Sequence, residues 1–309
     1  MKIVFLDALT LGNVDFERFK EFGEVEIYET TSADKTLSRV KDADIVVTNK
    51  IVIDKEIINN AKNLKFIQIA ATGMNNVDLE YADKKGILVK NVAGYSTESV
   101  LQQTFALVLG LLNRVKYFDE YTRTKYPESE IFTHIVDWFE IRGKRWGIIG
   151  LGKIGKRVAE VAKAFGAEVV YYSTSGKNNN NEYKRVTLDE LLKTSDIISI
   201  HAPLNENTKD LIGFEEIMKM KKGAVLVNLG RGGIINEDEL AKALEVKDIL
   251  VGLDVFEREP INKDNPLLKF KEKTLLSPHI AWTSIEAREK LMDGIYKNIK
   301  EFCQTYPND

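Results

Sequence analysis

Histidine is the residue type that first suggests chemistry in this sequence, because the 309 residues include only three. An ordinary histidine titrates at about pH 6.5, which makes it the usual proton donor near neutral pH. His279 follows an apolar run that ends at Leu276, and His201 follows another that ends at Ile200. Position alone does not separate these two as candidate acids. His134 lies in a looser segment and is expected at the surface.

An arginine also follows an apolar run, in the stretch Val227-Asn228-Leu229-Gly230-Arg231-Gly232-Gly233. The planar guanidinium of arginine binds a carboxylate through two parallel hydrogen bonds. The glycines on both sides favour a close approach of Arg231 to a ligand. The alternative is an arginine in a solvated loop.

Carboxylates follow the apolar run Ile249–Leu253: Asp254 comes directly after it, with Glu257 and Glu259 a few residues on. A carboxylate beside His279 would hold the imidazole in one tautomer and favour its protonated form. Glu257 and Glu259 could equally be ordinary surface charges, and the residues alone do not choose between them. A carbonyl reductase needs a proton donor that titrates near neutral pH, and histidine is the usual choice.

A glycine-rich turn stands between the apolar run Trp146–Ile149 and a helical pattern over Lys156–Phe165. It reads Gly150-Leu151-Gly152-Lys153-Ile154-Gly155. The three glycines would allow a tight turn, a close approach of the backbone to a pyrophosphate, and close packing of helix and strand. The N-terminus of the helix would attract the phosphates. Glycine triplets also arise by chance, but a strand before this one and a helix after it favour a dinucleotide site.

The acidic residue that normally ends the second strand of such a site is missing. The strand Glu168–Tyr172 is followed by Ser173, Thr174, Ser175, Gly176 and Lys177. An acid there would bind the ribose 2′-hydroxyl of NAD and repel the 2′-phosphate of NADP. Two interpretations stay open: an enzyme that tolerates NADP, or an NAD enzyme that lacks this contact.

Short apolar runs and amphipathic stretches alternate along the chain, which predicts parallel sheets covered by helices. The first series of predicted strands is Lys2–Leu6, Val25–Tyr28, Ile45–Val47, Phe66–Ile69 and Ile87–Val89. One long helix is predicted from Val100 to about Thr122. A second series of six strands follows, which matches a complete dinucleotide-binding fold: Trp146–Ile149, Glu168–Tyr172, Ile197–Ile200, Ala224–Asn228, Ile249–Leu253 and Thr274–Leu276.

Composition excludes several classes of protein. The net charge is −3, which argues against nucleic acid as the main partner. The most apolar stretch, 105–112, is far too short to span a membrane, and no signal peptide is recognised at the N-terminus. The single Cys303 excludes an internal disulfide and a cysteine-based zinc site, and no metal site is expected. A cytoplasmic enzyme is therefore expected.

Taken together, these motifs resemble the D-isomer-specific 2-hydroxyacid dehydrogenases over essentially the whole chain. They comprise the glycine-rich turn, His201-Ala202-Pro203-Leu204, Asn228 to Gly232, Gly252 to Glu257 and Ser277-Pro278-His279. The segments Ala71 to Asp78, Asn91 to Thr97 and Pro278 to Trp282 are most similar to the glycerate dehydrogenase (hydroxypyruvate reductase) branch. Each motif is weak alone, but their order and spacing are specific.

The resemblance implies a role for each residue. Arg231, Glu259 and His279 match the catalytic residues. Gly73 and Met74 match a loop whose backbone N–H groups hold the substrate carboxylate. Arg231 and His279 would also bind the substrate. His201 falls in a cofactor-lining motif, and Ser173 stands where the family has its acidic ribose-binding residue. The implied cofactor-binding residues are Thr104, Gly150, Gly152, Lys153, Ile154, Gly155, Ser173, Thr174, His201, Pro203, Leu229, Gly230, Asp254 and Trp282.

The resemblance also implies a fold of two Rossmann-like lobes. Residues 1–95 with 284–309 would form a smaller, flavodoxin-like substrate domain. Residues 96–283 would form a six-stranded, doubly wound cofactor domain inserted in it, and closure of the cleft between the domains would exclude water. Relatives are typically homodimers joined through the cofactor domain, so the long helix and residues 124–142 are the candidate interface.

The implied activity is the transfer of a hydride between NAD(P)H and a small 2-keto acid, most simply hydroxypyruvate or glyoxylate, giving the D-2-hydroxy acid. The alternative is a regulatory binding protein of the same fold that senses the dinucleotide, since fold alone does not decide function. The complete set of Arg231, Glu259 and His279 favours the enzyme. The sequence does not identify the physiological substrate, because a pocket separates neighbouring acids by only about 1–3 kcal/mol per methylene.

Overall fold

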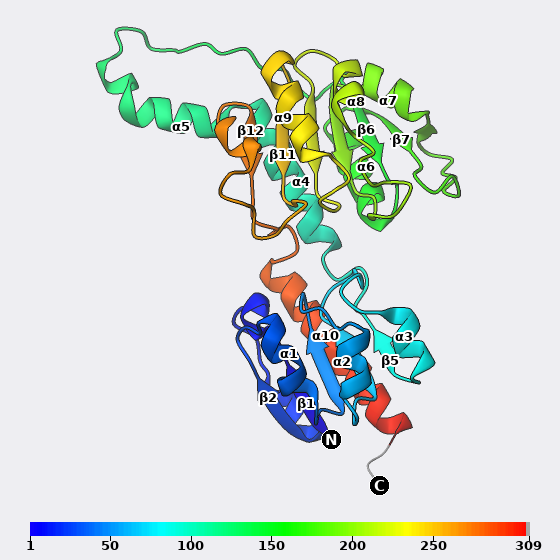
Figure 1. The fold of residues 1–309 in the computed structure, drawn as a ribbon. Helices are drawn as coiled ribbons and strands as arrows, with labels where there is room; N and C mark the ends of the chain where they lie inside the picture. The colour runs from blue at the N-terminus through cyan, green and yellow to red at the C-terminus, as the bar shows by residue number, and fades with distance from the viewer. Residues whose placement is uncertain (307–309) are drawn as a thin grey trace. The chain divides into compact units, whose positions relative to one another are not determined.

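A computed structural model describes residues 1–306. The chain forms two compact units, one made of residues 1–96 with the chain from Thr283 onward, and one made of Thr97–Trp282 (Figure 1). Each unit contains one sheet in which all strands are parallel. Among residues 1–306, no helix is both long and apolar enough to cross a membrane.

The first unit has a five-stranded sheet in the order β2-β1-β3-β4-β5, which confirms the predicted flavodoxin-like arrangement. Its strands are β1 (Lys2–Phe5), β2 (Glu24–Ile27), β3 (Ile45–Thr48), β4 (Phe66–Ile69) and β5 (Leu88–Lys90). One face packs on a core with α1 (Ala33–Val40), α2 (Lys55–Asn60) and α3 (Leu79–Lys84). On the other face, Phe66 stacks on Phe302 of α10 (Ile285–Thr305) and Phe5 packs on Phe19. The 3-10 turns η1 (Ala8–Leu11) and η2 (Glu17–Phe22) complete this unit. For residues 16–21 the sequence predicts a helix, and η2 lies there instead.

The second unit has a seven-stranded sheet in the order β12-β11-β10-β9-β6-β7-β8. The prediction of six strands was therefore wrong by one, and the strand it missed is β8, which has two exposed residues and no apolar pattern. All six predicted strands are present. The strands are β6 (Arg145–Ile149), β7 (Glu168–Tyr172), β8 (Lys184–Arg185), β9 (Ile197–Ile200), β10 (Val225–Asn228), β11 (Leu250–Leu253) and β12 (Thr274–Leu276).

Helices cover both faces of this sheet. Side chains alternate along each strand, so that Ile148 packs in one core and Ile149 in the other. The first core includes residues of α4 (Thr97–Leu112) and α6 (Lys153–Ala164). The second includes residues of α7 (Leu188–Thr194), α8 (Phe214–Lys219) and α9 (Glu237–Val246). The doubly wound architecture is thus confirmed, with η4 (Pro266–Lys269) between β11 and β12.

The single long helix predicted from Val100 to Thr122 is instead two helices, α4 and α5 (Val115–Thr124). Arg114 between them has a φ of 51°, which is left-handed and breaks the helical hydrogen bonding. Half of the α4 residues are buried, whereas none of the α5 residues is. The apolar periodicity continues across Asn113 and Arg114, which explains why it concealed the break.

An extended segment follows α5 and runs through η3 (Tyr126–Glu128) to about residue 140, away from the sheet of this unit (Figure 1). It exposes large apolar side chains, with Phe132 90% and Ile135 80% exposed. His134, which was expected at the surface, is half-buried there in an aromatic cluster. Its ring stacks on Tyr121 at 4.2 Å between centroids, and its Nε2 lies 2.8 Å from the hydroxyl of Tyr117.

Candidate active site

Three neighbouring strands of the second unit position the three predicted catalytic residues. Strands β10, β11 and β12 lie side by side and parallel, so the loops that follow them meet at one edge of the sheet. Arg231 lies in the loop after β10, Glu259 in the loop after β11 and His279 in the turn after β12. Gly73 and Met74 belong to the other unit, in the turn after β4.

His279 and Glu259 form a direct pair. The Nδ1 atom of His279 lies 2.7 Å from Oε2 of Glu259, and the two side chains are 19% and 29% exposed. The other oxygen of Glu259 accepts a hydrogen bond from the backbone N–H of Phe256 at 3.2 Å. This second bond holds the Glu259 carboxylate in place against the imidazole. The carboxylate therefore holds the orientation of the imidazole ring.

The backbone of His279 is held in an unusual conformation, with a φ of 54°. Left-handed backbone is uncommon outside glycine and persists where surrounding contacts impose it. The N–H of His279 donates to the carbonyl oxygen of Asp254 at 2.8 Å and lies 3.0 Å from that of Ser277. The turn that carries His279 is therefore tied by its backbone to the end of β11.

The buried carboxylate of Asp254 completes this attachment. It accepts hydrogen bonds from the Ser277 hydroxyl at 2.6 Å, the Ile280 N–H at 3.0 Å and the Ala281 N–H at 2.9 Å. Burial raises the pKa of Asp254, and these three donors oppose the rise. The side chain of Gln103 on α4 donates in turn to the Ser277 hydroxyl at 3.2 Å. Asp254 thus positions the His279 turn; its predicted place near a nicotinamide stays a prediction.

Asn228 organises the Arg231 loop. Its buried side chain accepts from the Gly230 N–H at 3.0 Å and donates to the Arg231 carbonyl at 2.9 Å. The guanidinium of Arg231 is half-buried and donates through Nη1 to the carbonyl of Gly230 at 2.8 Å. At Gly232 the loop presses on its neighbour, because a Cβ atom there would lie 1.8 Å from the carbonyl oxygen of Phe256. The Arg231 loop and the Glu259 loop are therefore in backbone contact.

The glycine-rich turn lies between β6 and α6, as the sequence predicts. Gly150 has a φ of 93°, and a Cβ there would lie 2.9 Å from the backbone nitrogen of Ala202. A Cβ at Gly155 would lie 2.3 Å from the carbonyl oxygen of Gly150. Around Gly152, the residue before α6, a Cβ would meet nothing within 4 Å. The turn is thus tight where helix and strand meet and open at the helix N-terminus, which suits a pyrophosphate.

Buried polar atoms without partners surround this turn. Among residues 1–306, neither ring nitrogen of His201 nor Oγ of Ser173 has a hydrogen-bond partner, although all three atoms are buried. Burial lowers the pKa of His201 to about 3, so its imidazole is neutral. His201, Gly150 and Ser173 follow the adjacent strands β9, β6 and β7. Unpaired polar atoms around an open helix N-terminus fit a dinucleotide, which would supply partners for them.

The other predicted cofactor residues occupy varied surroundings. Thr104 is fully buried within α4, where its hydroxyl donates to the Val100 carbonyl at 2.7 Å. Thr174 is half-buried next to Ser173, and Pro203 is exposed after β9. The rest lie in the glycine-rich turn, in the Arg231 loop and at the end of the His279 turn: Lys153, Ile154, Leu229, Gly230 and Trp282.

Two charged residues that sequence reasoning missed lie beside these loops. Arg185 on β8 donates through Nη1 to the carbonyl of Gly176 at 3.0 Å, in the turn that follows β7. Glu237 on α9 accepts from the backbone N–H of Glu257 in the Glu259 loop at 2.6 Å. Neither residue belongs to an apolar pattern or a glycine motif, so the sequence carries no signal for it.

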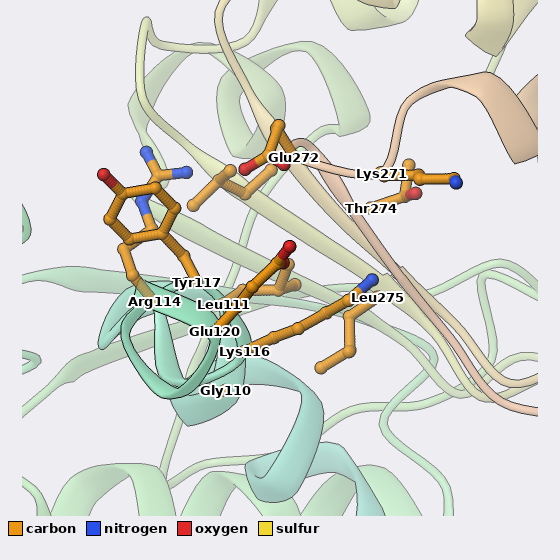
Figure 2. A pocket seen from close by; sticks show the side chains of 11 residues that line it. Gly110, Leu111, Arg114, Lys116, Tyr117, Glu120, Lys271, Glu272, Thr274 and Leu275 are labelled. Atoms are coloured by element: carbon orange, nitrogen blue, oxygen red, sulfur yellow. The ribbon is translucent and has the colours of Figure 1, made fainter. Parts of the chain in front are cut away.

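The pocket drawn in Figure 2 contains none of these residues. It lies where β11 and β12 begin, at the opposite ends of those strands from Glu259 and His279. Arg114, Tyr117 and Glu120 line it on one side, and Lys271, Glu272 and Thr274 on the other. Its charges are mixed, and we assign it no part in the candidate site.

Comparison with known proteins agrees with this geometry. Residues 105–281 match the family model described as the NAD-binding domain of the D-isomer-specific 2-hydroxyacid dehydrogenases. The chain is 39% identical to a hydroxypyruvate reductase of Blautia hydrogenotrophica, over 99% of this chain and 98% of that protein. It is 37% identical to a glyoxylate reductase of Aeropyrum pernix, over 97% and 91%.

A solved structure extends the likeness to the fold. An acyclic imino acid reductase in complex with NADPH and D-Arg superimposes with a TM-score of 0.88 at 31% identity, over 99% of this chain and 98% of that one. The family match covers more than half of the chain and the relatives span nearly all of it. The chain therefore belongs to the family of D-isomer-specific 2-hydroxyacid dehydrogenases, which are NAD-dependent oxidoreductases.

Proposed function

We propose that the protein reduces a small 2-keto acid to the D-2-hydroxy acid with NADH or NADPH, with hydroxypyruvate and glyoxylate as substrates, and catalyses the reverse oxidation. The observation that carries this proposal is the pair of His279 and Glu259, whose side chains lie 2.7 Å apart. The loop that carries Glu259 is in backbone contact with the Arg231 loop. Relatives named hydroxypyruvate reductase and glyoxylate reductase support the choice of substrates.

The residues would divide the chemistry as follows. When bound, the reduced nicotinamide supplies the hydride that adds to the keto carbon. His279 donates the proton that the developing alkoxide needs, from Nε2, because Nδ1 faces Glu259. Arg231 binds the substrate through its planar guanidinium and stabilises the negative charge. Gly73 and Met74 are proposed to hold the carboxylate through backbone N–H groups.

The dinucleotide would bind along the carboxyl ends of β6, β7 and β9. Gly152 and the N-terminus of α6 would receive the pyrophosphate, and the neutral ring of His201 would gain a partner. The remaining proposed contacts are those implied by the family motifs: Thr104, Gly150, Lys153, Ile154, Gly155, Ser173, Thr174, Pro203, Leu229, Gly230, Asp254 and Trp282.

Turnover of purified protein tests this function directly. With hydroxypyruvate or glyoxylate and NADH or NADPH, we expect the absorbance of the reduced nicotinamide to fall at a rate proportional to enzyme concentration. A protein that binds the dinucleotide but turns over neither acid would instead support the alternative, a regulatory protein that senses the dinucleotide. Family membership and the assembled His279–Glu259 pair favour the enzyme.

The turn after β7 predicts that NADPH is accepted. It carries Ser173 in place of an acid, and Arg185 lies against it with a guanidinium 3.0 Å from the Gly176 carbonyl. We expect turnover with NADPH within about tenfold of that with NADH, because nothing acidic in this turn repels a 2′-phosphate. Arg185→Gln should weaken the binding of NADPH at least a few-fold more than that of NADH.

Fluorescence titration of both cofactors with the wild type and Arg185→Gln measures this difference without turnover. Lys184→Gln is the matched control, because Lys184 on the same strand pairs with Glu190 at 3.1 Å instead. Equal losses for NADH and NADPH in Arg185→Gln would show that Arg185 only supports the turn. Strong discrimination against NADPH by the wild type would mean that another residue reads the ribose.

We also propose that two copies associate through the second unit, as the resemblance to the family implies. The segment after α5 exposes Ile131, Phe132, Ile135 and Trp138, each by more than half of its surface. An apolar segment so exposed is typical of a surface that another chain covers.

A cytoplasmic location likewise remains a prediction from the sequence.

Phe132→Glu is expected to shift the protein from dimer to monomer, because a carboxylate at the 90% exposed ring position cannot be buried in an apolar interface. Light scattering coupled to size-exclusion chromatography measures the mass. Leu9→Glu, at an exposed residue of the first unit, is the control and should stay dimeric. A wild type that elutes as a monomer at micromolar concentration would refute the proposal.

A further inference from the structure

Glu237, the first residue of α9, has a buried carboxylate that is not needed to cap its own helix. Asn236 already does so, because its side chain accepts from the N–H of Glu239 at 3.0 Å. Burial raises the pKa of Glu237, so a carboxylate at this place requires compensating partners. Both of its oxygens have one, and both partners belong to the chain that follows β11.

The contacts of Glu237 are reciprocal with Glu257. Oε1 of Glu237 accepts from the backbone N–H of Glu257 at 2.6 Å, and Oε1 of Glu257 lies 3.2 Å from the backbone N–H of Glu237. Oε2 of Glu237 accepts from the side-chain amide of Asn265 at 2.6 Å. The amide orientation of Asn265 is set independently, because its oxygen accepts from the N–H of Leu267 at 3.0 Å.

These contacts act on the segment that carries the catalytic pair. The N–H of Phe256 holds Glu259, and the N–H of the next residue, Glu257, is held by Glu237. The carbonyl of Phe256 lies against Gly232 in the Arg231 loop. We propose that Glu237 is a positioning residue for catalysis, which fixes the Glu259 loop and so sets how the Glu259 carboxylate meets His279. This inference rests on the proposed roles of His279 and Glu259.

The Asn265 contact allows a sharp test by exchange of partners. Glu237→Gln places an amide N–H₂ against either the Asn265 amide or the Glu257 N–H, so one donor always loses its acceptor. Adding Asn265→Asp restores a donor–acceptor pair, because the new carboxylate accepts from the Gln amide and still accepts from Leu267. We expect Glu237→Gln to lower reductive kcat about tenfold, since small displacements at a catalytic group have large effects. The double variant should recover to within about threefold.

Two further readouts and a control variant separate positioning from simple stability. In Glu237→Gln, the dissociation constant of NADH should stay within about twofold. The pH at which reduction declines should fall, because a loosened Glu259 holds its negative charge farther from the His279 ring. Glu239→Gln is the control on the same helical turn, since its carboxylate accepts from Phe214 at the start of α8, and its kcat should match the wild type.

The outcomes separate this inference from the proposed function. Normal kcat and an unchanged pH profile in Glu237→Gln, or a loss that Asn265→Asp does not recover, would overturn the positioning role, as would a lower free energy of unfolding in urea without a kinetic change. His279→Gln is measured alongside. Normal turnover in that variant would refute the proposed function itself, whatever Glu237→Gln does.

Discussion

Replacement of Arg231 by lysine is expected to lower kcat/KM for hydroxypyruvate by at least about a hundredfold. The guanidinium donates to the Gly230 carbonyl at 2.8 Å, and its planar shape leaves further N–H groups in the same plane for a carboxylate and a carbonyl oxygen. A lysine ammonium has no such plane and cannot satisfy these acceptors together. Steady-state kinetics over a range of hydroxypyruvate concentrations measure the loss.

The binding of NADH separates a substrate role from a general defect. In Arg231→Lys the dissociation constant of NADH should stay within about twofold, because Asn228 holds the loop backbone at both Gly230 and Arg231. Arg123→Lys is the matched control: Arg123 is an exposed residue of α5 paired with Asp119, and its kinetics should equal those of the wild type. Near-normal turnover of hydroxypyruvate in Arg231→Lys would show that the assigned role is wrong.

The sequence was sufficient to find the elements that carry Arg231 and His279. Both residues follow apolar runs that are strands of one parallel sheet, and the carboxyl ends of such strands lie at one edge. The apolar runs are recognisable because both faces of the sheet are covered by helices, which leaves the strands almost wholly apolar. Where a strand is short and exposed, as in β8, this signal vanishes.

The choice between Glu257 and Glu259 was beyond the residues alone. Both lie in an irregular loop, where no periodicity tells which way a side chain points. In the structure the carboxylate of Glu257 faces the N–H of Glu237, and that of Glu259 faces His279. Only the resemblance to a family distinguished them beforehand. The buried network of Glu237 and Asn265 joins residues 28 positions apart, and no local pattern encodes such a contact.

The pH dependence of the reaction should depend on Glu259. In the proposed mechanism, reduction requires protonated His279, so the rate of reduction declines as rising pH removes that proton. The Glu259 carboxylate lies 2.7 Å from Nδ1, where its negative charge is attracted to the positive charge that protonation places on the ring. In Glu259→Gln, which removes that charge, we expect the decline to move to lower pH. Oxidation requires the neutral imidazole, so its activity should extend further toward acid.

The two histidines after strands provide matched variants for this experiment, which measures kcat/KM against pH in both directions. In His279→Gln the decline of reduction with rising pH should disappear, and the rate should be lower by about a hundredfold to ten-thousandfold. His201→Gln should keep the decline of reduction with rising pH. Burial lowers the pKa of His201 to about 3, so this residue stays neutral over the range of the assay. Its binding of NADH could weaken. If the pH at which reduction declines is unchanged in Glu259→Gln, the pairing is rejected. If the same pH dependence persists in His279→Gln, His279 is rejected as the proton donor.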